Sequence, residues 1–282
     1  MARVLIAGCG YVGEAVATRF HEEGWQVEGW TGSAASAAKL SERPYPVRAV
    51  DVTKAEAVSK AGKAFDVVIH SVSSRGGDEE QYRRLYFEGA KNLIAAFPDA
   101  TLILTGSTSV YPQKDGSIVD ESSPAEPLHA RGMILRETEK LVLAAGGIVA
   151  RLGGIHGPGR SYFLTKFLEG AGDKTGTRFI NQIHRDDIVA ALLLLARRRS
   201  ECAGQIYNVV GDEPIQSRTA YEWLAARLTP PPPKPSEPRR PRTRGESNKR
   251  VSSQKLRALG WRPRYPTFEA AMAESILPSF GF

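Results

Sequence analysis

The chain has 282 residues, of which 41% are hydrophobic, and its formal net charge is +7. This size suits one large α/β domain, or one such domain with a smaller lobe. The longest apolar run, residues 188–196, is far shorter than the roughly 20 residues that cross a bilayer. No secretory signal precedes the first expected strand at residue 3, and the two cysteines, Cys9 and Cys202, suggest neither a disulfide framework nor a metal site. We therefore expect a cytoplasmic protein with no membrane contact and no bound metal.

The positive charge is concentrated in a segment rich in proline and arginine. Residues 234–250 hold seven basic and two acidic side chains, so the segment carries +5. Because its prolines exclude helices and central strands, we expect an extended surface loop over residues 229–247. The segment lacks interleaved aromatic residues and any recognised reading motif, so we predict no nucleic-acid partner. Contact with an anionic ligand or partner is the alternative.

In chain order, a buried strand at residues 3–7 leads into a glycine-rich turn and an amphipathic helix. The turn reads Gly8-Cys9-Gly10-Tyr11-Val12-Gly13. Gly8 allows the tight bend, Gly10 lets the backbone approach a pyrophosphate, and Gly13 lets the helix pack closely on the strand. The free N–H groups and the dipole at the helix start favour a phosphate. The sequence therefore predicts a dinucleotide site here, with Tyr11 and Val12 in contact with the cofactor.

Short β-branched runs then alternate with helical patterns through the first two hundred residues. We expect strands at 3–7, 26–30, 47–50, 67–70, 101–104, 147–152 and 205–209. We expect helices at 12–23, 33–40, 78–97, 130–145 and 185–198. Continuously apolar strands such as 67–69 are typical of burial on both faces, hence of a parallel sheet with helices on either side. The pattern predicts an α/β, Rossmann-like, doubly wound parallel sheet.

After Leu152 the pattern loosens into a turn cluster at 153–159, followed later by helical stretches at 218–228, 253–259 and 267–276. We therefore divide the chain into two parts. Residues 1–152, joined by the segment around 184–209, are expected to form the dinucleotide-binding domain. Residues 153–183 and 210–282 are expected to form a small C-terminal α/β substrate lobe over the carboxyl edge of the sheet.

Several motifs in order resemble the short-chain dehydrogenase/reductase superfamily, on its extended, epimerase/dehydratase-like side. They are Val50-Asp51-Val52, His70-Ser71-Val72-Ser73, Ser107-Thr108-Ser109-Val110-Tyr111, residues 151–159, Ile183-His184-Arg185-Asp186-Asp187-Ile188, Tyr207-Asn208-Val209-Val210 and residues 248–253. The resemblance implies that Asp51 and Val52 contact adenine, and that Ser71 and Ser73 lie beside the cofactor. It also implies that Gly154 lies along the nicotinamide and that Ser107 is the catalytic hydroxyl.

The chain departs from this family in two places. The glycine turn is one residue shorter than in most extended members, a spacing found in atypical ones. The family's proton donor, a tyrosine four residues before a lysine, is also replaced: Gly132 and Glu139 fix the register, which puts Arg131 and Leu135 at those positions. An arginine cannot serve as the acid, because its pKa lies above about 12. Tyr162 and Lys166 have the family's spacing but lie after the sixth strand, so we set them aside.

The second strand suggests which cofactor is bound. An NAD site usually places an acidic residue at the end of this strand, on the ribose 2′-hydroxyl. Here Thr31 and Ser33 stand at the end and could donate to a 2′-phosphate, with Lys39 as an additional cation. We therefore expect NADP, with NAD as the alternative if Glu28 reaches the ribose.

The remaining candidates for chemistry follow strand ends and turns. Ser107 could polarise a substrate oxygen or simply cap its strand. Tyr111 could replace the missing proton donor or be structural. Arg131 could bind an anionic group or a developing oxyanion. His156 and Arg160 are candidates for substrate contact, by acid–base chemistry and by charge, against roles in packing and as a solvated loop charge.

Three functions fit these residues. The first is an NADP-preferring oxidoreductase or epimerase-like enzyme with an altered proton path, acting on a small or nucleotide-sugar-like substrate. The second is a non-catalytic NADP-binding sensor or scaffold, and the third a lyase or isomerase without net redox change. Fold alone does not separate them. The sequence leaves the oligomeric state open between monomer and homodimer.

Overall fold

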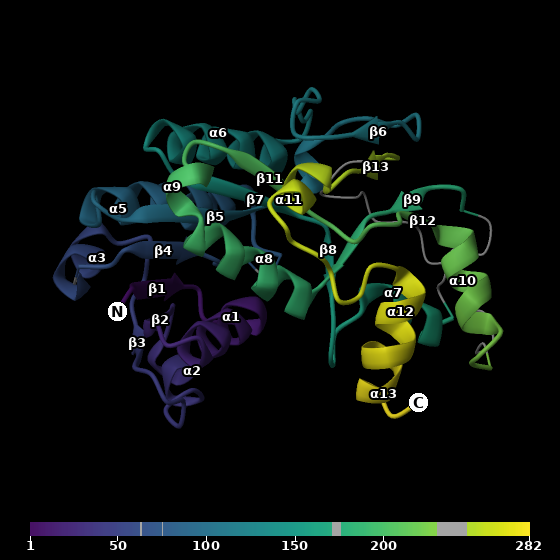
Figure 1. Cartoon of the computed structure of the whole chain (residues 1–282), viewed down its shortest axis with the longest axis horizontal. Helices are drawn as coiled ribbons and strands as arrows, with labels where there is room; N and C mark the ends of the chain where they lie inside the picture. Colours follow the sequence, from purple (N-terminus) through teal and green to yellow (C-terminus); the bar gives the residue numbers. More distant parts are fainter. Residues whose placement is uncertain (63, 75, 171–175, 230–246) are drawn as a thin grey trace.

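The computed structural model describes residues 1–62, 64–74, 76–170, 176–229 and 247–282. A seven-stranded sheet in the order β11-β7-β5-β4-β1-β2-β3 forms its centre, and every neighbouring pair is parallel (Figure 1). The strands are β1 (Arg3–Ala7), β2 (Gln26–Thr31), β3 (Val47–Ala49), β4 (Val67–His70), β5 (Thr101–Ser107), β7 (Ile148–Leu152) and β11 (Ile206–Val209). The sheet reverses direction of winding at β1, so the predicted doubly wound fold is confirmed.

Helices cover both faces of this sheet because its strands are apolar on both sides. On one face lie α1 (Tyr11–Glu22) and α8 (Arg185–Arg197), and Phe20 and Leu192 are among their buried residues. On the other face lie α3 (Ala55–Ala61), α5 (Gly89–Ala96) and α6 (Ala130–Ala144). Burying the apolar side chains of these helices against the sheet stabilises the fold by roughly 25 cal/mol for each Å² of apolar surface removed from water.

The helix predicted at 78–97 is present, with one irregular turn inside it. It consists of α4 (Glu79–Arg83), a π-helical turn η1 (Arg84–Glu88) and α5. Asp78 caps its start, since the carboxylate accepts a hydrogen bond from the amide of Gln81. The wider π turn holds one more residue than an α turn and so changes the direction of the side chains within it.

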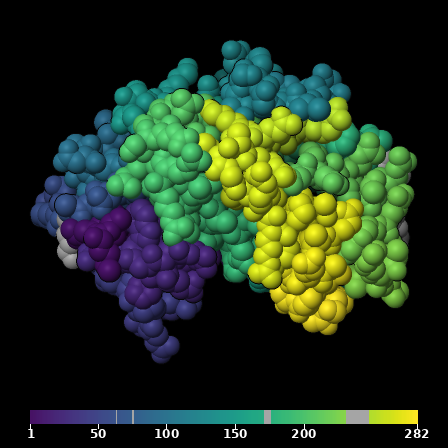
Figure 2. All heavy atoms as spheres, viewed as in Figure 1, coloured from purple at the N-terminus to yellow at the C-terminus, as the bar shows by residue number. Residues whose placement is uncertain are grey.

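The C-terminal lobe has its own apolar core beside the sheet. Its helical elements are α7 (Tyr162–Leu168), α10 (Ser217–Ala225), α12 (Phe268–Ala271), the π turn η3 (Met272–Ile276) and α13 (Leu277–Ser279). Short strand pairs connect it to the sheet: β8 (Gly154–His156) with β10 (Gln182–His184), β9 (Phe179–Ile180) with β12 (Ile215–Gln216), and β6 (Ile118–Val119) with β13 (Arg250–Val251). In Figure 2 a notch separates the purple N-terminal part from the yellow C-terminal helices.

The remaining elements are α2 (Ala34–Ala38), the 3-10 turn η2 (Thr108–Val110), α9 (Arg199–Cys202) and α11 (Gln254–Ala258). The sequence did not predict α3, α7, α9, α13, η2 or the short strands, and the strand predicted at 101–104 ends three residues before β5 does. Most of the predicted proline-rich loop, residues 230–246, lies outside the described residues. Among the residues that the structure describes, no helix has the length and apolar character needed to cross a membrane.

Candidate functional site

A cavity of about 480 Å³ opens at the carboxyl edge of the sheet, where ligands bind in folds of this kind. The ends of β1, β2, β4, β5 and β7 and the residues that follow β3 contribute to its wall. The structure brings thirteen of the predicted site residues together here: Gly8, Gly10, Tyr11, Val12, Thr31, Ser33, Asp51, Val52, Ser71, Ser73, Ser107, Gly154 and Arg160. Gly13, Tyr111, Arg131 and His156 lie outside this lining.

The glycine turn after β1 contributes to the wall of the cavity, and each of its three glycines is needed for a different physical reason. Gly8 has φ +106°, and a Cβ there would come within 2.5 Å of the Ser71 backbone. A Cβ on Gly13 would lie 2.1 Å from the Gly8 carbonyl oxygen. Gly13 is therefore required so that α1 can pack closely on the turn, and not for contact with a ligand. At Gly10, the N-cap of α1, the space is open. The backbone there and the N–H groups of the first helical turn fit a pyrophosphate.

The end of β2 presents hydroxyl groups rather than a carboxylate. Glu28 is buried: its Oε1 accepts hydrogen bonds from Trp30 Nε1 at 2.8 Å and from Arg48 Nη1 at 3.0 Å. Thr31, Ser33 and Ser36 line the cavity instead. The alternative in which Glu28 reaches a ribose therefore finds no support in this placement.

Just after β3, Asp51 lines the cavity and accepts hydrogen bonds from the amide and hydroxyl of Thr53, at 3.0 and 2.8 Å. In the turn after β1, burial raises the pKa of the Cys9 thiol to about 12, which keeps the thiol protonated. Cys9 is therefore an apolar filler of the glycine turn rather than a nucleophile.

Ser107 is the last residue of β5 and lines the same cavity. Its Oγ accepts a hydrogen bond from the Ser109 amide at 3.2 Å, and the hydroxyl proton remains available to donate. Leu135 of α6 also lines the wall and is only 1% exposed. An apolar side chain thus occupies the position that the family resemblance gives to a lysine.

Among the lining residues that the sequence did not predict, three come from one helix: Tyr82, Leu85 and Tyr86. They come from the helix that follows β4. Tyr82 and Tyr86 are four residues apart, and their ring centroids lie 4.3 Å apart. The spacing predicts that they share one helix face, but the sequence did not indicate that this face meets the cavity.

Arg131 does not turn toward the cavity. Its Nη2 donates to the Gly77 carbonyl oxygen at 2.5 Å, and its guanidinium lies 5.7 Å from the ring centroid of Tyr82. The side chain therefore joins α6 to the loop before α4. This placement gives no support to a role for Arg131 on a reacting oxygen.

Tyr111 is buried beneath the site. Its hydroxyl donates to Asn208 Oδ1 at 2.9 Å, and its carbonyl oxygen accepts from Lys249 Nζ at 2.8 Å. Burial raises the pKa of Tyr111, and the Arg151 guanidinium packs over its ring. These contacts make Tyr111 a structural residue, so the predicted proton-donor role finds no support here.

His156 is likewise buried, at 3% exposure, and its ring packs near His184 rather than in the cavity. Burial lowers the pKa of His156 to about 3, so the ring is neutral at pH 7. Acid–base contact of His156 with substrate therefore finds no support. Tyr162, set aside above, is 77% exposed, and Lys166 pairs with Glu169.

Arg160 does line the cavity, close to the glycine turn. Its guanidinium lies 5.1 Å from the ring centroid of Tyr11, and the Tyr11 hydroxyl donates to the Pro158 carbonyl oxygen at 3.1 Å. The loop that carries Arg160 is thereby attached to the glycine turn. The structure places a positive charge where an anionic group of a ligand could reach it.

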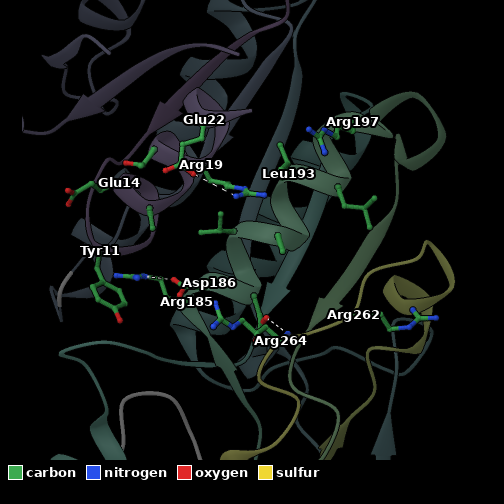
Figure 3. Close-up of a pocket in the computed structure, with 16 residues that line it drawn as sticks. Tyr11, Glu14, Arg19, Glu22, Arg185, Asp186, Leu193, Arg197, Arg262 and Arg264 are labelled. Atoms are coloured by element: carbon green, nitrogen blue, oxygen red, sulfur yellow. Dashed lines mark hydrogen bonds and ion pairs between the residues drawn. The ribbon is translucent and has the colours of Figure 1, made fainter. Parts of the chain in front are cut away.

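A second hollow, of about 660 Å³, lies between α1 and α8 (Figure 3). Tyr11 lines both hollows, and Arg185 lies 5.3 Å from its ring centroid on this second side. Arginines of this groove already pair with neighbouring acids, as Arg185 does with Asp186 and Arg19 does with Glu23. The groove therefore presents mixed, largely paired charges rather than an anion site.

The chain is similar to several known proteins. Protein YeeZ of Escherichia coli (strain K12) is 29% identical over 247 residues, covering 83% of this chain and 86% of YeeZ. The UDP-glucose 4-epimerase of Thermotoga maritima, solved with UDP-glucose, aligns with a TM-score of 0.83 at 16% identity over 99% of this chain and 98% of that one. The UDP-glucose 4-epimerase of Thermus thermophilus, in complex with NAD, aligns with a TM-score of 0.80 at 21% identity over 96% of each chain.

The model of the NAD dependent epimerase/dehydratase family matches residues 4–210, a range that reaches every strand of the central sheet and includes the whole lining of the cavity. This match covers well over half of the chain. The protein therefore belongs to the NAD dependent epimerase/dehydratase family.

Proposed function

We propose that the protein is an NAD(P)-dependent oxidoreductase or epimerase/dehydratase-like enzyme that acts on a small or nucleotide-sugar-like substrate. One observation carries this proposal. A single cavity is lined both by the glycine turn after β1 and by Ser107 at the end of β5, as a dinucleotide whose nicotinamide meets a substrate would require. The structures of relatives solved with UDP-glucose and with NAD support the substrate and cofactor classes.

The bound cofactor would supply hydride transfer, and the residues of this chain would position the reactants. The Gly10 backbone would hold the pyrophosphate, and Ser107 would donate a hydrogen bond to the reacting oxygen of the substrate. Arg160 would attract an anionic group of the substrate, such as a phosphate. Leu135 would exclude water from the nicotinamide end.

NADP is the cofactor that we propose. Its support is the chemistry at the end of β2, where Ser33 and Ser36 present hydroxyls to the cavity and the Thr31 hydroxyl donates to the Ser33 carbonyl oxygen, while Glu28 is held in contacts with Trp30 and Arg48. Hydroxyls can donate hydrogen bonds to a 2′-phosphate, whereas a carboxylate would repel it. NAD remains the alternative cofactor.

Two measurements test this function. Calorimetry on nucleotide-free protein should give tighter binding of NADPH than of NADH. A panel of carbonyl compounds and nucleotide sugars should then include a substrate that changes NADPH absorbance, and Ser107→Ala should abolish that change. Absence of binding for both nucleotides would contradict the proposal at its root.

A second function is a non-catalytic NADP-binding sensor or scaffold. The observation in its favour is that Arg131 is held by Gly77, outside the cavity, while Leu135 fills the lysine position. Tight cofactor binding with no turnover across the whole panel would favour this alternative. If the double variant Arg131→Tyr and Leu135→Lys gains activity, the parent site is a disabled form of the family's usual site with a tyrosine and a lysine.

A further inference from the structure

The helix after β4 carries a phenol into the wall of the cavity beside the catalytic end. Tyr86 lies within the π turn η1 and is half-buried, and its ring packs on Tyr82. Both tyrosines belong to an apolar cluster with Leu135 of α6 and Val110, three residues beyond Ser107. Single π turns inside helices occur frequently at functional sites, where the added residue redirects a side chain.

Proton-transfer groups are few in this cavity. Among the described residues that line it, the ionisable side chains are Cys9, Tyr11, Asp51, Tyr82, Tyr86 and Arg160. Cys9 lies in the phosphate turn, and the Tyr11 hydroxyl donates to Pro158. Asp51 follows β3, which lies on the far side of β1 from Ser107 in the strand order. An arginine does not release a proton near neutral pH.

The two tyrosines of this helix differ in their surroundings. Tyr82 is only 6% exposed, and the Arg131 guanidinium lies against its ring. Tyr86 is less buried, and its ring centroid lies 6.4 Å from that of His70, the last residue of β4. Tyr82 therefore fits a supporting position between Arg131 and Tyr86.

We propose that Tyr86 is the proton donor and acceptor of this site, a catalytic residue supplied by the helix after β4 in place of the usual tyrosine of α6. The proposal rests on the proposed function. In the reducing direction, Tyr86 donates its phenolic proton to the carbonyl oxygen of the substrate while the carbonyl carbon accepts a hydride from the reduced nicotinamide. The carbonyl becomes an alcohol, the cofactor is oxidised, and the phenolate regains a proton from solvent. Tyr82 and Arg131 are positioning residues.

The charges near Tyr86 allow its ionisation to be followed. The titratable and charged groups on the elements packed around it include His70, Tyr82, Arg131 and the exposed Arg83–Glu137 pair, with Arg84 and Glu88 on its own turn. Burial lowers the pKa of His70 to about 4, so His70 stays neutral above pH 6. A nicotinamide carries a positive charge only when it is oxidised. Binding of the oxidised cofactor should therefore promote ionisation of a phenol beside it.

The experiment is calorimetry of NADP⁺ and NADPH binding to nucleotide-free protein between pH 7 and 9.5, in buffers of different ionisation enthalpy. We expect NADP⁺ to release a proton on binding and to gain up to tenfold in affinity per pH unit, whereas NADPH does neither. Tyr86→Phe should abolish both effects, and measurable NADPH binding by this variant would show that it is folded. Tyr162→Phe, which alters an exposed tyrosine outside the cavity, should behave as the parent.

Three results would overturn the assignment while leaving the proposed function intact. These are no proton release by the parent protein, undiminished release by Tyr86→Phe, or loss of release in Tyr82→Phe but not in Tyr86→Phe. Failure of every variant and the parent to bind either nucleotide would overturn the proposed function together with it. Once a substrate is known, Tyr86→Phe should lower turnover by about 10²-fold or more.

Discussion

Arg151 donates to both carboxylate oxygens of Glu139, from Nε at 2.9 Å and from Nη2 at 2.8 Å, and neither side chain is more than 1% exposed. The pair joins α6 to β7. Glu139 also lies close to Gly106 of β5, since a Cβ added to Gly106 would be 3.4 Å from Glu139 Oε1. Gly106 directly precedes Ser107, so the pair supports the strand end that carries the candidate catalytic hydroxyl.

Breaking this pair should be costly. Glu139→Gln leaves the Arg151 guanidinium buried without its counter-charge, and we expect a loss of about 3–5 kcal/mol in the free energy of unfolding. Glu137→Gln is the matched control, because Glu137 pairs with Arg83 at a surface where both side chains are 45% exposed. The control should lose less than about 1 kcal/mol. Urea denaturation measures both values, and equal losses would contradict the argument.

Substitutions at two glycines of the glycine turn should have separate effects on folding and on cofactor binding. Gly13→Ala would place a Cβ 2.1 Å from the Gly8 carbonyl oxygen, so we expect a lower melting temperature. Gly10→Ala meets open space at an extended backbone conformation, so its melting temperature should stay near that of the parent. The added methyl group should nevertheless weaken NADPH binding by about tenfold, or 1.4 kcal/mol, because it fills the space offered to the pyrophosphate. Unchanged NADPH affinity in Gly10→Ala would show that the pyrophosphate does not bind at Gly10.

A new carboxylate at the end of β2 should reverse the cofactor preference. Ser36 lines the cavity beside Ser33, and an aspartate at this third helical position is compatible with the Ser33 cap. Ser36→Asp should therefore fold normally and lower NADPH affinity by about tenfold through repulsion of the 2′-phosphate, with NADH affinity little changed.

Ser41→Asp adds the same charge outside the cavity and serves as the control for this substitution. Calorimetry at low ionic strength gives the clearest comparison, because salt screens the repulsion. An equal loss of NADH and NADPH affinity in Ser36→Asp would remove the support for NADP.

Stability should fall as the solution becomes acidic. Burial lowers the pKa of His156 to about 3 and that of His184 and His70 to about 4. The folded state therefore resists protonation that the unfolded chain accepts near pH 6.5. Each histidine contributes stability that is complete above pH 6.5 and declines by roughly 1.4 kcal/mol per pH unit as the pH falls toward the folded pKa.

Asp187 acts in the opposite direction. Burial raises its pKa from 3.8 to about 6, so its contribution is complete below pH 3.8 and is lost as the pH rises through 6. The three histidines outweigh this single group between pH 4 and 6. Urea denaturation at pH 7 and pH 5 should show a lower free energy of unfolding at pH 5. In His156→Asn this free energy should fall less between the two pH values, because one of the three histidines no longer contributes. A flat profile would contradict the burial of these rings.

The fold and the part of the site formed by strand ends were predictable from the sequence, because both depend on short, local sequence patterns. The glycine turn follows a strand and begins a helix, and the thirteen predicted residues that meet in one cavity mostly follow strand ends. Residues on helices were harder to place. Tyr86 lines the cavity from within a π turn, and Arg131 lies outside the cavity lining, where it donates to the Gly77 carbonyl oxygen. Neither contact has a signature in the sequence, since both depend on packing between separate elements.

The path of the chain ties the lobe to the sheet. After β7 the backbone enters the lobe through β8 and α7, returns through α8 to supply β11 at the sheet edge, and leaves again for α10 (Figure 1). A truncation after residue 152 would strip the edge strand from β7 and uncover the hydrophobic side of α1. No single cut can release either half intact, so chemical denaturation should melt both together in one cooperative step.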